Sequence, residues 1–186
     1  MQHVAYRVRA LRAGMLSQRT FPRCPFRGRA RALRSGDMTR EWSRQPYLIS
    51  TAPERLDLDV IHGYLTQSYW AGGRSRERVE ASIAHSFALG LYHQRGSERA
   101  EQVGFARVVS DRATFAYLAD VFVLEAHRGR GLGVWLVETA LGLPECEGVR
   151  WLLGTRDAHE LYRKFGFLET PPGRMMRRDG INPLRA

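Results

Sequence analysis

The sequence predicts a mixed α/β domain built on a mostly antiparallel sheet with flanking helices. Three strand-like segments follow one another closely, over 87–94, 103–110 and 114–124, with only short polar turns between them. Strands spaced this closely are typical of an antiparallel meander. Helical spacing of apolar residues then alternates with one more strand toward the C-terminus, which adds the α/β character.

Apolar periodicity and capping residues place the other elements. We predict a strand over 47–50, a helix over 54–67, and a second helix capped by Ser75 with Val79 and Ile83 on its buried face. The later segments are predicted in this order: an amphipathic helix opened by 129–133, a strand over 149–154, a helix over 157–164 with capping-box spacing, and final strands over 167–170 and 174–177.

Charge is distributed unevenly along the 186 residues. The chain has 29 Lys and Arg against 19 Asp and Glu, a formal net charge of +10. Residues 1–37 hold nine arginines and one acid, or 9 − 1 = +8, which leaves 29 − 9 = 20 cations and 19 − 1 = 18 acids, or +2, for residues 38–186. We therefore expect an Arg-rich, disordered leader over 1–37 and one folded domain over 38–186.

The leader has three open interpretations. It could be a disordered or wrongly included extension, in which case Met38 would serve as an alternative start. It could also be a mitochondrial targeting peptide, which is typically Arg-rich and poor in acids, or a nucleic-acid-binding tail. A secretory signal is not expected, because no continuous apolar run follows the charges.

Other sequence features exclude several classes of protein. No apolar run approaches the length of about 18 residues that a membrane-spanning helix needs. Cys24 and Cys146 form no CxxC pair, and the six histidines show no metal-binding spacing, so no metal site is expected. Unpaired thiols are typical of a reducing compartment, and we expect a cytoplasmic protein.

The segment Val121–Gly133 is the most informative part of the chain. A strand leads into a glycine-rich loop, and the loop becomes the N-terminus of an amphipathic helix. Free amide groups at a helix N-terminus, with Arg128 and Arg130 beside them, favour a phosphate or pyrophosphate ligand. The dinucleotide and P-loop templates both fail, because Val134 stands where the first needs glycine and no Gly-Lys-Ser/Thr is present for the second.

Two motifs in this chain resemble those of the GNAT family of N-acetyltransferases. Arg128, Gly131 and Gly133 match the R/Q-x-x-G-x-G/A motif for acetyl-CoA, and residues 158–167 match the later A-x-x-L-Y-x-x-x-G-F motif. Thr155 departs from the asparagine that often precedes this second motif. The element order from residue 47 onward also resembles that of the family.

The resemblance implies the GNAT acyl-CoA N-acyltransferase fold. It further implies direct transfer of an acetyl group from acetyl-CoA to a primary amine of a small molecule, with no metal, and makes a homodimer plausible. Backbone groups of Val121 and Val123 would contact the pantetheine arm, and an N–H near Val123 would stabilise the developing oxyanion. The pyrophosphate would bind to Arg128, Gly129, Arg130, Gly131, Gly133 and Val134.

Two residues are candidates for acid and base. Tyr162 sits at the general-acid position that the resemblance implies, and we favour this role over the alternative of an ordinary core aromatic. Strand alternation places Asp120 on one face with Leu118, Phe122 and Leu124. Burial among apolar neighbours disfavours a charged carboxylate, which suits a general base, but a structural Asp120 paired with an arginine is as well supported.

The acceptor site is expected near the loop between the first two helices. Tyr69 and Trp70 lie there and could line a small amine pocket. Arg107 could hold an acceptor carboxylate, or pair with Asp120 or Glu101. Two rival functions stay open: a non-catalytic CoA-binding sensor, and nucleic-acid binding through the leader, which we regard as the weaker interpretation.

Overall fold

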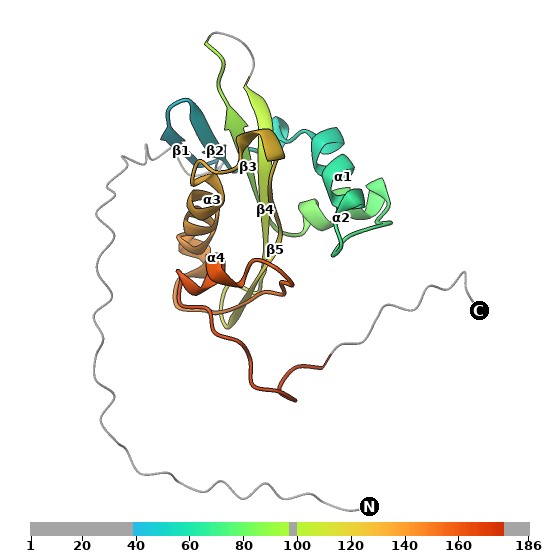
Figure 1. Cartoon of the computed structure of the whole chain (residues 1–186), viewed down its shortest axis with the longest axis vertical. Coiled ribbons are helices and arrows are strands. Elements are labelled where there is room, and N and C mark those ends of the chain that lie inside the picture. Colours follow the sequence, from blue (N-terminus) through green and yellow to red (C-terminus); the bar gives the residue numbers. More distant parts are fainter. Residues whose placement is uncertain (1–38, 97–99, 177–186) are drawn as a thin grey trace, which may run out of the picture.

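The computed structural model describes residues 39–96 and 100–176. Within them one sheet runs in chain order: β1 (Glu41–Arg44), β2 (Tyr47–Ser50), β3 (Phe87–His93), β4 (Glu101–Ser110), β5 (Phe115–Val123) and β6 (Arg150–Leu152). Neighbouring strands are antiparallel, except that β5 and β6 are parallel. The predicted class, a mixed α/β fold with a mostly antiparallel sheet, is confirmed (Figure 1).

The helices cover both faces of this sheet (Figure 1). α1 (Leu58–Gln67) and α2 (Arg76–Ala84) lie on one face, and α3 (Leu132–Leu141) lies on the other. The short α4 (His159–Arg163) follows β6, and its apolar residues pack against the same core cluster as α3. Two apolar clusters result, one under each helical layer.

Burial explains why these helices dock as they do. α3 presents Trp135, Leu136, Val137 and Ala140 to the sheet, and each of these side chains is buried. On the other face Ile61 and Leu65 of α1 and Val79 of α2 pack against Phe105 and Phe122 of the sheet. Burying side chains of this size stabilises the fold by about 1.5–3 kcal/mol each relative to leaving them exposed.

Side-chain caps mark the starts of α1 and α2, whereas α3 and α4 begin without one, and two helix starts differ from the prediction. Ser75 caps α2 as predicted, with Oγ accepting from the Arg78 amide. α1 begins later than predicted because Asp57 caps it, accepting from two amides, and residues 53–55 form a separate 3-10 turn. The predicted cap by Asp157 is wrong: Thr155 Oγ1 accepts from the Ala158 amide at 3.0 Å instead.

The sheet also differs from the prediction at both ends. β1 was not predicted; it is a short, mostly exposed strand that pairs with β2. The strand predicted over 167–170 is wrong, since the chain there has left the sheet and the Leu168 side chain is 87% exposed. Residues 174–176 form no strand either, and residue 177 lies outside the described residues, as does the leader.

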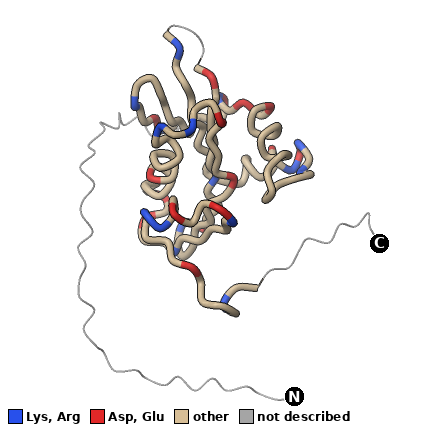
Figure 2. Tube along the Cα trace, viewed as in Figure 1, with Lys and Arg blue, Asp and Glu red and all other residues tan. Residues whose placement is uncertain are grey.

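Basic and acidic positions are interspersed over the described chain in this view (Figure 2). Arg76 pairs with Asp59 and Glu80, and Arg163 pairs with Glu160 and Glu169. Exposed pairs of this kind contribute about 0–1 kcal/mol each, so they mainly keep the surface charge mixed. Among the described residues no helix is long and apolar enough to cross a membrane, and no group of three or more His, Cys, Asp or Glu could hold a metal ion.

The contact between β4 and β5 leaves no room for a side chain at Gly104. A Cβ atom there would lie 2.8 Å from the Phe122 carbonyl oxygen and 3.0 Å from Leu91 Cδ2. We expect Gly104→Ala to lower the free energy of unfolding by about 1–3 kcal/mol, because β5 would have to move. The measurement is denaturant unfolding followed by circular dichroism.

Gly63 provides the matched control for this substitution. It is exposed in the interior of α1, and a Cβ atom there would meet nothing within 4 Å. Gly63→Ala should therefore raise the free energy of unfolding by about 0.5–1 kcal/mol. Equal stability of the two variants would contradict the close approach of β4 and β5.

Candidate active site

The site begins where β5 and β6 separate. The two strands pair over only three residues each, Phe115–Tyr117 with Arg150–Leu152, whereas β5 continues to Val123. From residue 118 onward β5 keeps β4 as its neighbour on one side, and no strand within residues 39–96 and 100–176 pairs with its other side. Two cavities open along this free edge of β5.

The first cavity lies at the N-terminus of α3, and we name it the helix-end cavity. Gly131 caps α3 in the left-handed conformation (φ 74°), without any side-chain cap. The first helical hydrogen bond runs from the Trp135 amide to the Gly131 carbonyl, so the amides of Leu132, Gly133 and Val134 have no acceptor within the helix. Together with the helix dipole, these free donors form an anion site.

Seven of the eight predicted cofactor contacts line the helix-end cavity, which has a volume of about 340 Å³. They are Val121, Val123, Arg128, Gly129, Gly131, Gly133 and Val134. A Cβ atom built on any of the three glycines would meet nothing within 4 Å, so the loop leaves open space above its backbone. Free amides and open space fit a pyrophosphate-bearing ligand such as acetyl-CoA.

The two arginines of this loop have different surroundings. Arg128 lines the helix-end cavity, and its guanidinium donates to the Val123 carbonyl (Nε, 3.0 Å) and to Tyr64 Oη (Nη2, 3.0 Å). Arg130 does not line this cavity, and instead donates from Nη1 to Tyr47 Oη at 3.1 Å. The structure therefore places Arg130 apart from the other predicted cofactor contacts, because its guanidinium is directed to Tyr47 of β2.

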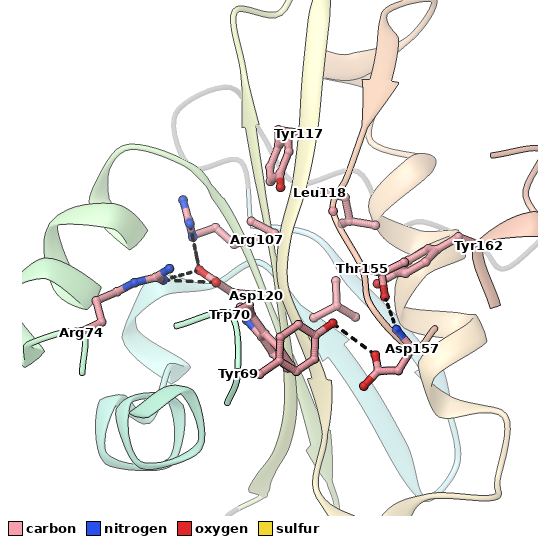
Figure 3. Close-up of a pocket in the computed structure, with 13 residues that line it drawn as sticks. Tyr69, Trp70, Arg74, Arg107, Tyr117, Leu118, Asp120, Thr155, Asp157 and Tyr162 are labelled. Atoms are coloured by element: carbon pink, nitrogen blue, oxygen red, sulfur yellow. Dashed lines mark hydrogen bonds and ion pairs between the residues drawn. The ribbon is translucent and has the colours of Figure 1, made fainter. Parts of the chain in front are cut away.

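The second cavity has aromatic walls, and we name it the aromatic cavity (Figure 3). It has a volume of about 250 Å³, and Tyr69, Trp70, Tyr117 and Tyr162 line it together with polar residues. All five predicted catalytic and acceptor-site residues border it: Tyr69, Trp70, Arg107, Asp120 and Tyr162. Val121 and Tyr162 border both cavities, so the two cavities meet at these residues.

Tyr162 of α4 lies half-buried at this junction. Its ring packs against the edge of Phe167, and no described residue hydrogen-bonds to its hydroxyl. Burial raises the pKa of Tyr162 to about 12. Its hydroxyl therefore stays protonated at neutral pH and is free to donate a proton or a hydrogen bond.

Asp120 lies at a β-bulge in β5. The pairing of Phe105 with Phe122 shifts to Arg107 with Ala119, so β5 carries an extra residue, and Asp120 adopts φ 53°. A bulge of this kind reverses the alternation of side chains along a strand. The predicted common face is therefore wrong: Leu118 packs under α3, whereas Phe122 and Leu124 pack under α1 and α2.

Two arginines converge on the buried Asp120 carboxylate (Figure 3). Arg74 Nη1 lies 3.2 and 3.1 Å from the two oxygens, and Arg107 Nε lies 2.8 Å from Oδ2. Of the alternatives for Arg107, the structure therefore contains the pair with Asp120. Both carboxylate oxygens of Asp120 are therefore already engaged by guanidinium groups.

A loop from the helical layer closes over the aromatic cavity. Tyr69 Oη accepts from the Arg156 amide (2.9 Å) and donates to Asp157 Oδ1 (3.2 Å), and the Arg156 guanidinium lies 3.9 Å from the centre of the Tyr69 ring. Trp70 packs edge-on against Tyr69. The segment between α1 and α2 therefore touches the segment between β6 and α4, although they are more than 80 residues apart in sequence.

Sequence reasoning missed Tyr117 and Asp157 as lining residues of the aromatic cavity. A signal was present for Asp157: it follows a parallel strand, and ligands commonly bind beyond the carboxyl ends of such strands. Tyr117 carried no comparable signal, because an aromatic residue on a strand usually packs in the core.

Comparisons with known proteins give the family of this chain. The family model for the acetyltransferase (GNAT) domain matches residues 79–169. A Gibberella zeae protein named as a candidate acetyltransferase is 34% identical over 142 residues, which cover 66% of this chain and 79% of that protein.

Solved structures give the same result. A Xanthomonas campestris pv. campestris protein assigned to the GNAT family is 42% identical, with a TM-score of 0.63 over 72% of this chain and 93% of that chain. A Staphylococcus aureus structure shares the fold at 21% identity, with a TM-score of 0.59 over 73% of this chain and 99% of its own. The relative from X. campestris, the relative from G. zeae and the two cavities along β5 lead to one conclusion: this chain belongs to the GNAT family of acetyltransferases.

Proposed function

We propose that this chain transfers an acetyl group directly from acetyl-CoA to a primary amine of a small molecule. The observation that supports this most strongly is the meeting of two cavities at Val121 and Tyr162. A donor in the helix-end cavity and an acceptor in the aromatic cavity would place their reacting groups at this junction. Such positioning lowers the barrier by removing the cost of bringing the two reactants together.

The donor would bind through its pyrophosphate. Amides of Leu132, Gly133 and Val134 point to the N-terminal end of α3, and Arg128 adds a fixed positive charge beside them. The pantetheine arm would then lie along the free edge of β5, where Val121 and Val123 supply backbone hydrogen-bonding groups. Thr155 Oγ1 accepts from the amides of Asp157 and Ala158, so we assign Thr155 no contact with the donor.

The proposed reaction replaces the thioester bond of acetyl-CoA with an amide bond. Acetyl-CoA supplies the thioester carbonyl carbon; the amine nitrogen forms a bond to it while the carbon–sulfur bond breaks. The amine gives up one proton to solvent water, the departing sulfur gains one, and the group that donates to the sulfur recovers its proton from water. Tyr162 is the proposed donor of the second proton, because its hydroxyl lacks a protein partner among the described residues and remains protonated.

We assign Asp120 a positioning role in place of general base. Its carboxylate already accepts hydrogen bonds from Arg74 and Arg107, and its side chain is only 3% exposed. A carboxylate held in this way orders both guanidinium groups at the wall of the aromatic cavity. The left-handed backbone of Asp120 is maintained at a cost of about 1–3 kcal/mol, which is common at functional sites.

The size of the aromatic cavity supports a small acceptor. Its volume of about 250 Å³ is below the range of about 300–1,000 Å³ that is typical for drug-sized ligands. Tyr69 and Trp70 would enclose the acceptor from the helical side.

A bulkier residue at Gly133 tests the donor site. We expect Gly133→Leu to raise the Kd for acetyl-CoA by about 5- to 150-fold, because its side chain would occupy the open space above the loop. Isothermal titration calorimetry measures the Kd, and thermal unfolding checks the fold. Gly63→Leu is the matched control, since Gly63 is also an unobstructed helical glycine but lies outside both cavities. Equal affinities of the two variants would contradict a donor site at this helix end.

Removal of one hydroxyl tests the acid. We expect Tyr162→Phe to lower kcat by about 10²- to 10⁴-fold while the Kd for acetyl-CoA stays unchanged. The measurement is amine-dependent release of free thiol from acetyl-CoA, with an amine panel as acceptors. A sensor would bind acetyl-CoA and release no thiol with any amine, and that outcome would favour the rival function.

Tyr92 supplies the matched control for Tyr162. Its hydroxyl is buried without a hydrogen-bond partner among the described residues, and burial raises its pKa well above the usual value. Tyr92 lines neither cavity. Tyr92→Phe should leave kcat unchanged and raise the free energy of unfolding by about 1 kcal/mol, because an unpaired buried hydroxyl is destabilising. A similar fall in kcat for both variants would show that Tyr162 acts through packing.

A further inference from the structure

One wall of the aromatic cavity carries more arginine charges than carboxylate charges. Arg74 and Arg107 carry one positive charge each, and they share the single carboxylate of Asp120. The cluster therefore keeps 2 − 1 = one net positive charge. A partly buried charge of this kind is stabilised by an opposite charge, so the excess points to an anionic ligand.

The excess charge is located on Arg74. Arg107 is only 11% exposed, and it uses Nε and Nη2 for Asp120 and Nη1 for Ser86 Oγ (3.0 Å). Arg74 is 26% exposed and reaches Asp120 through Nη1 alone. No described residue accepts a hydrogen bond from its Nε or Nη2. These two nitrogens form one edge of the guanidinium, and that edge matches the two oxygens of a carboxylate.

The opposite wall carries negative charge. Asp157 Oδ1 accepts from Tyr69, and no described residue donates to Oδ2. Figure 3 shows Arg74 and Asp157 on opposite sides of the cavity, with Asp120 and Tyr69 between them. Tyr162 lies on the same side as Asp157, so the reacting amine belongs at this end.

We propose that the acceptor is a small amino acid-like molecule, whose carboxylate binds the free edge of Arg74 and whose amine lies toward Asp157 and Tyr162. This inference rests on the proposed function, and it names the substrate class of that same site. Asp120 acts as a positioning residue that fixes the orientation of Arg74. An ammonium group is attracted to Asp157 on entry, and a carboxylate is attracted to Arg74, so a molecule with both groups binds in one orientation.

The experiment compares matched acceptors with the full chain. Amino acids with increasing distance between amine and carboxylate are each paired with the carboxamide that lacks the negative charge, and thiol release from acetyl-CoA is followed. We expect kcat/KM to be about 10- to 100-fold higher for the acid of the best pair, mainly through a lower KM. Ethanolamine and phosphoethanolamine form one further pair, which tests a phosphate as the anion.

Variants of Arg74 then assign the preference to one residue. In Arg74→Gln the ratio of kcat/KM for the acid to kcat/KM for the carboxamide should fall to about one. Arg74→Lys should keep part of the preference, because the charge remains but the two-nitrogen edge is lost. Arg78→Gln is the matched control: it removes the same charge from an exposed arginine of α2 outside the cavity, and it should keep the full preference.

Each other outcome has a definite meaning. No thiol release with any amine overturns the proposed function itself. Release with equal kcat/KM for acids and carboxamides leaves the proposed function standing and overturns this inference. A preference for phosphoethanolamine over every carboxylate overturns the carboxylate assignment. A preference that survives in Arg74→Gln shows that another group binds the anion.

Discussion

The separation of β5 from β6 is the constraint on which the rest of the site depends. Two parallel strands that stayed paired along their length would satisfy each other's backbone groups and leave no space between them. Here pairing ends after Tyr117 and Leu152, and the chain beyond β6 turns away to form α4. The helix-end cavity at the N-terminus of α3 and the aromatic cavity beneath the loop of Tyr69 both open along the free edge of β5. Both cavities therefore follow from one incomplete strand pair.

The bulge at Asp120 places charged side chains beside this edge of β5. An uninterrupted β5 would keep Leu118, Asp120 and Phe122 on one face, and the carboxylate would be directed under α3. The extra residue moves Asp120 to the side of α1 and α2, where Arg74 and Arg107 reach it. The backbone strain at one residue thus places a charged cluster at the wall of a cavity that is otherwise aromatic. The acceptor preference inferred above is a consequence of this local geometry.

Local signals were sufficient to predict most of the fold from the sequence. Apolar periodicity located the meander and α3, and Ser75 marked the start of α2, because these features depend on residues close together in the chain. The failures share a cause that is not local. Strands were predicted after Gly166 from composition alone, yet whether a strand forms there depends on a sheet neighbour that the structure does not supply. The Asp120 bulge likewise depends on the pairing with β4.

The candidate site could be predicted in part for the same reason. The glycine loop and Tyr162 belong to short motifs, and the motif residues Arg128, Gly131, Gly133 and Tyr162 do line the two cavities. The R/Q-x-x-G-x-G/A motif specifies Arg128 and leaves the position of Arg130 open, and of the two only Arg128 lines the helix-end cavity. Contacts between distant segments, such as Tyr69 with Asp157 or Arg74 with Asp120, could not be read from any motif. These contacts determine the charge pattern of the acceptor side, and only the folded chain reveals them.

The central claim is that acetyl transfer takes place where the helix-end and aromatic cavities meet. A crystal structure of the full chain with acetyl-CoA tests it most directly. The account predicts the pyrophosphate on the amides of Leu132, Gly133 and Val134, with the thioester sulfur within hydrogen-bonding reach of Tyr162 Oη. A bound acetyl-CoA whose thioester lies away from the free edge of β5, or whose sulfur is remote from Tyr162, would contradict the account.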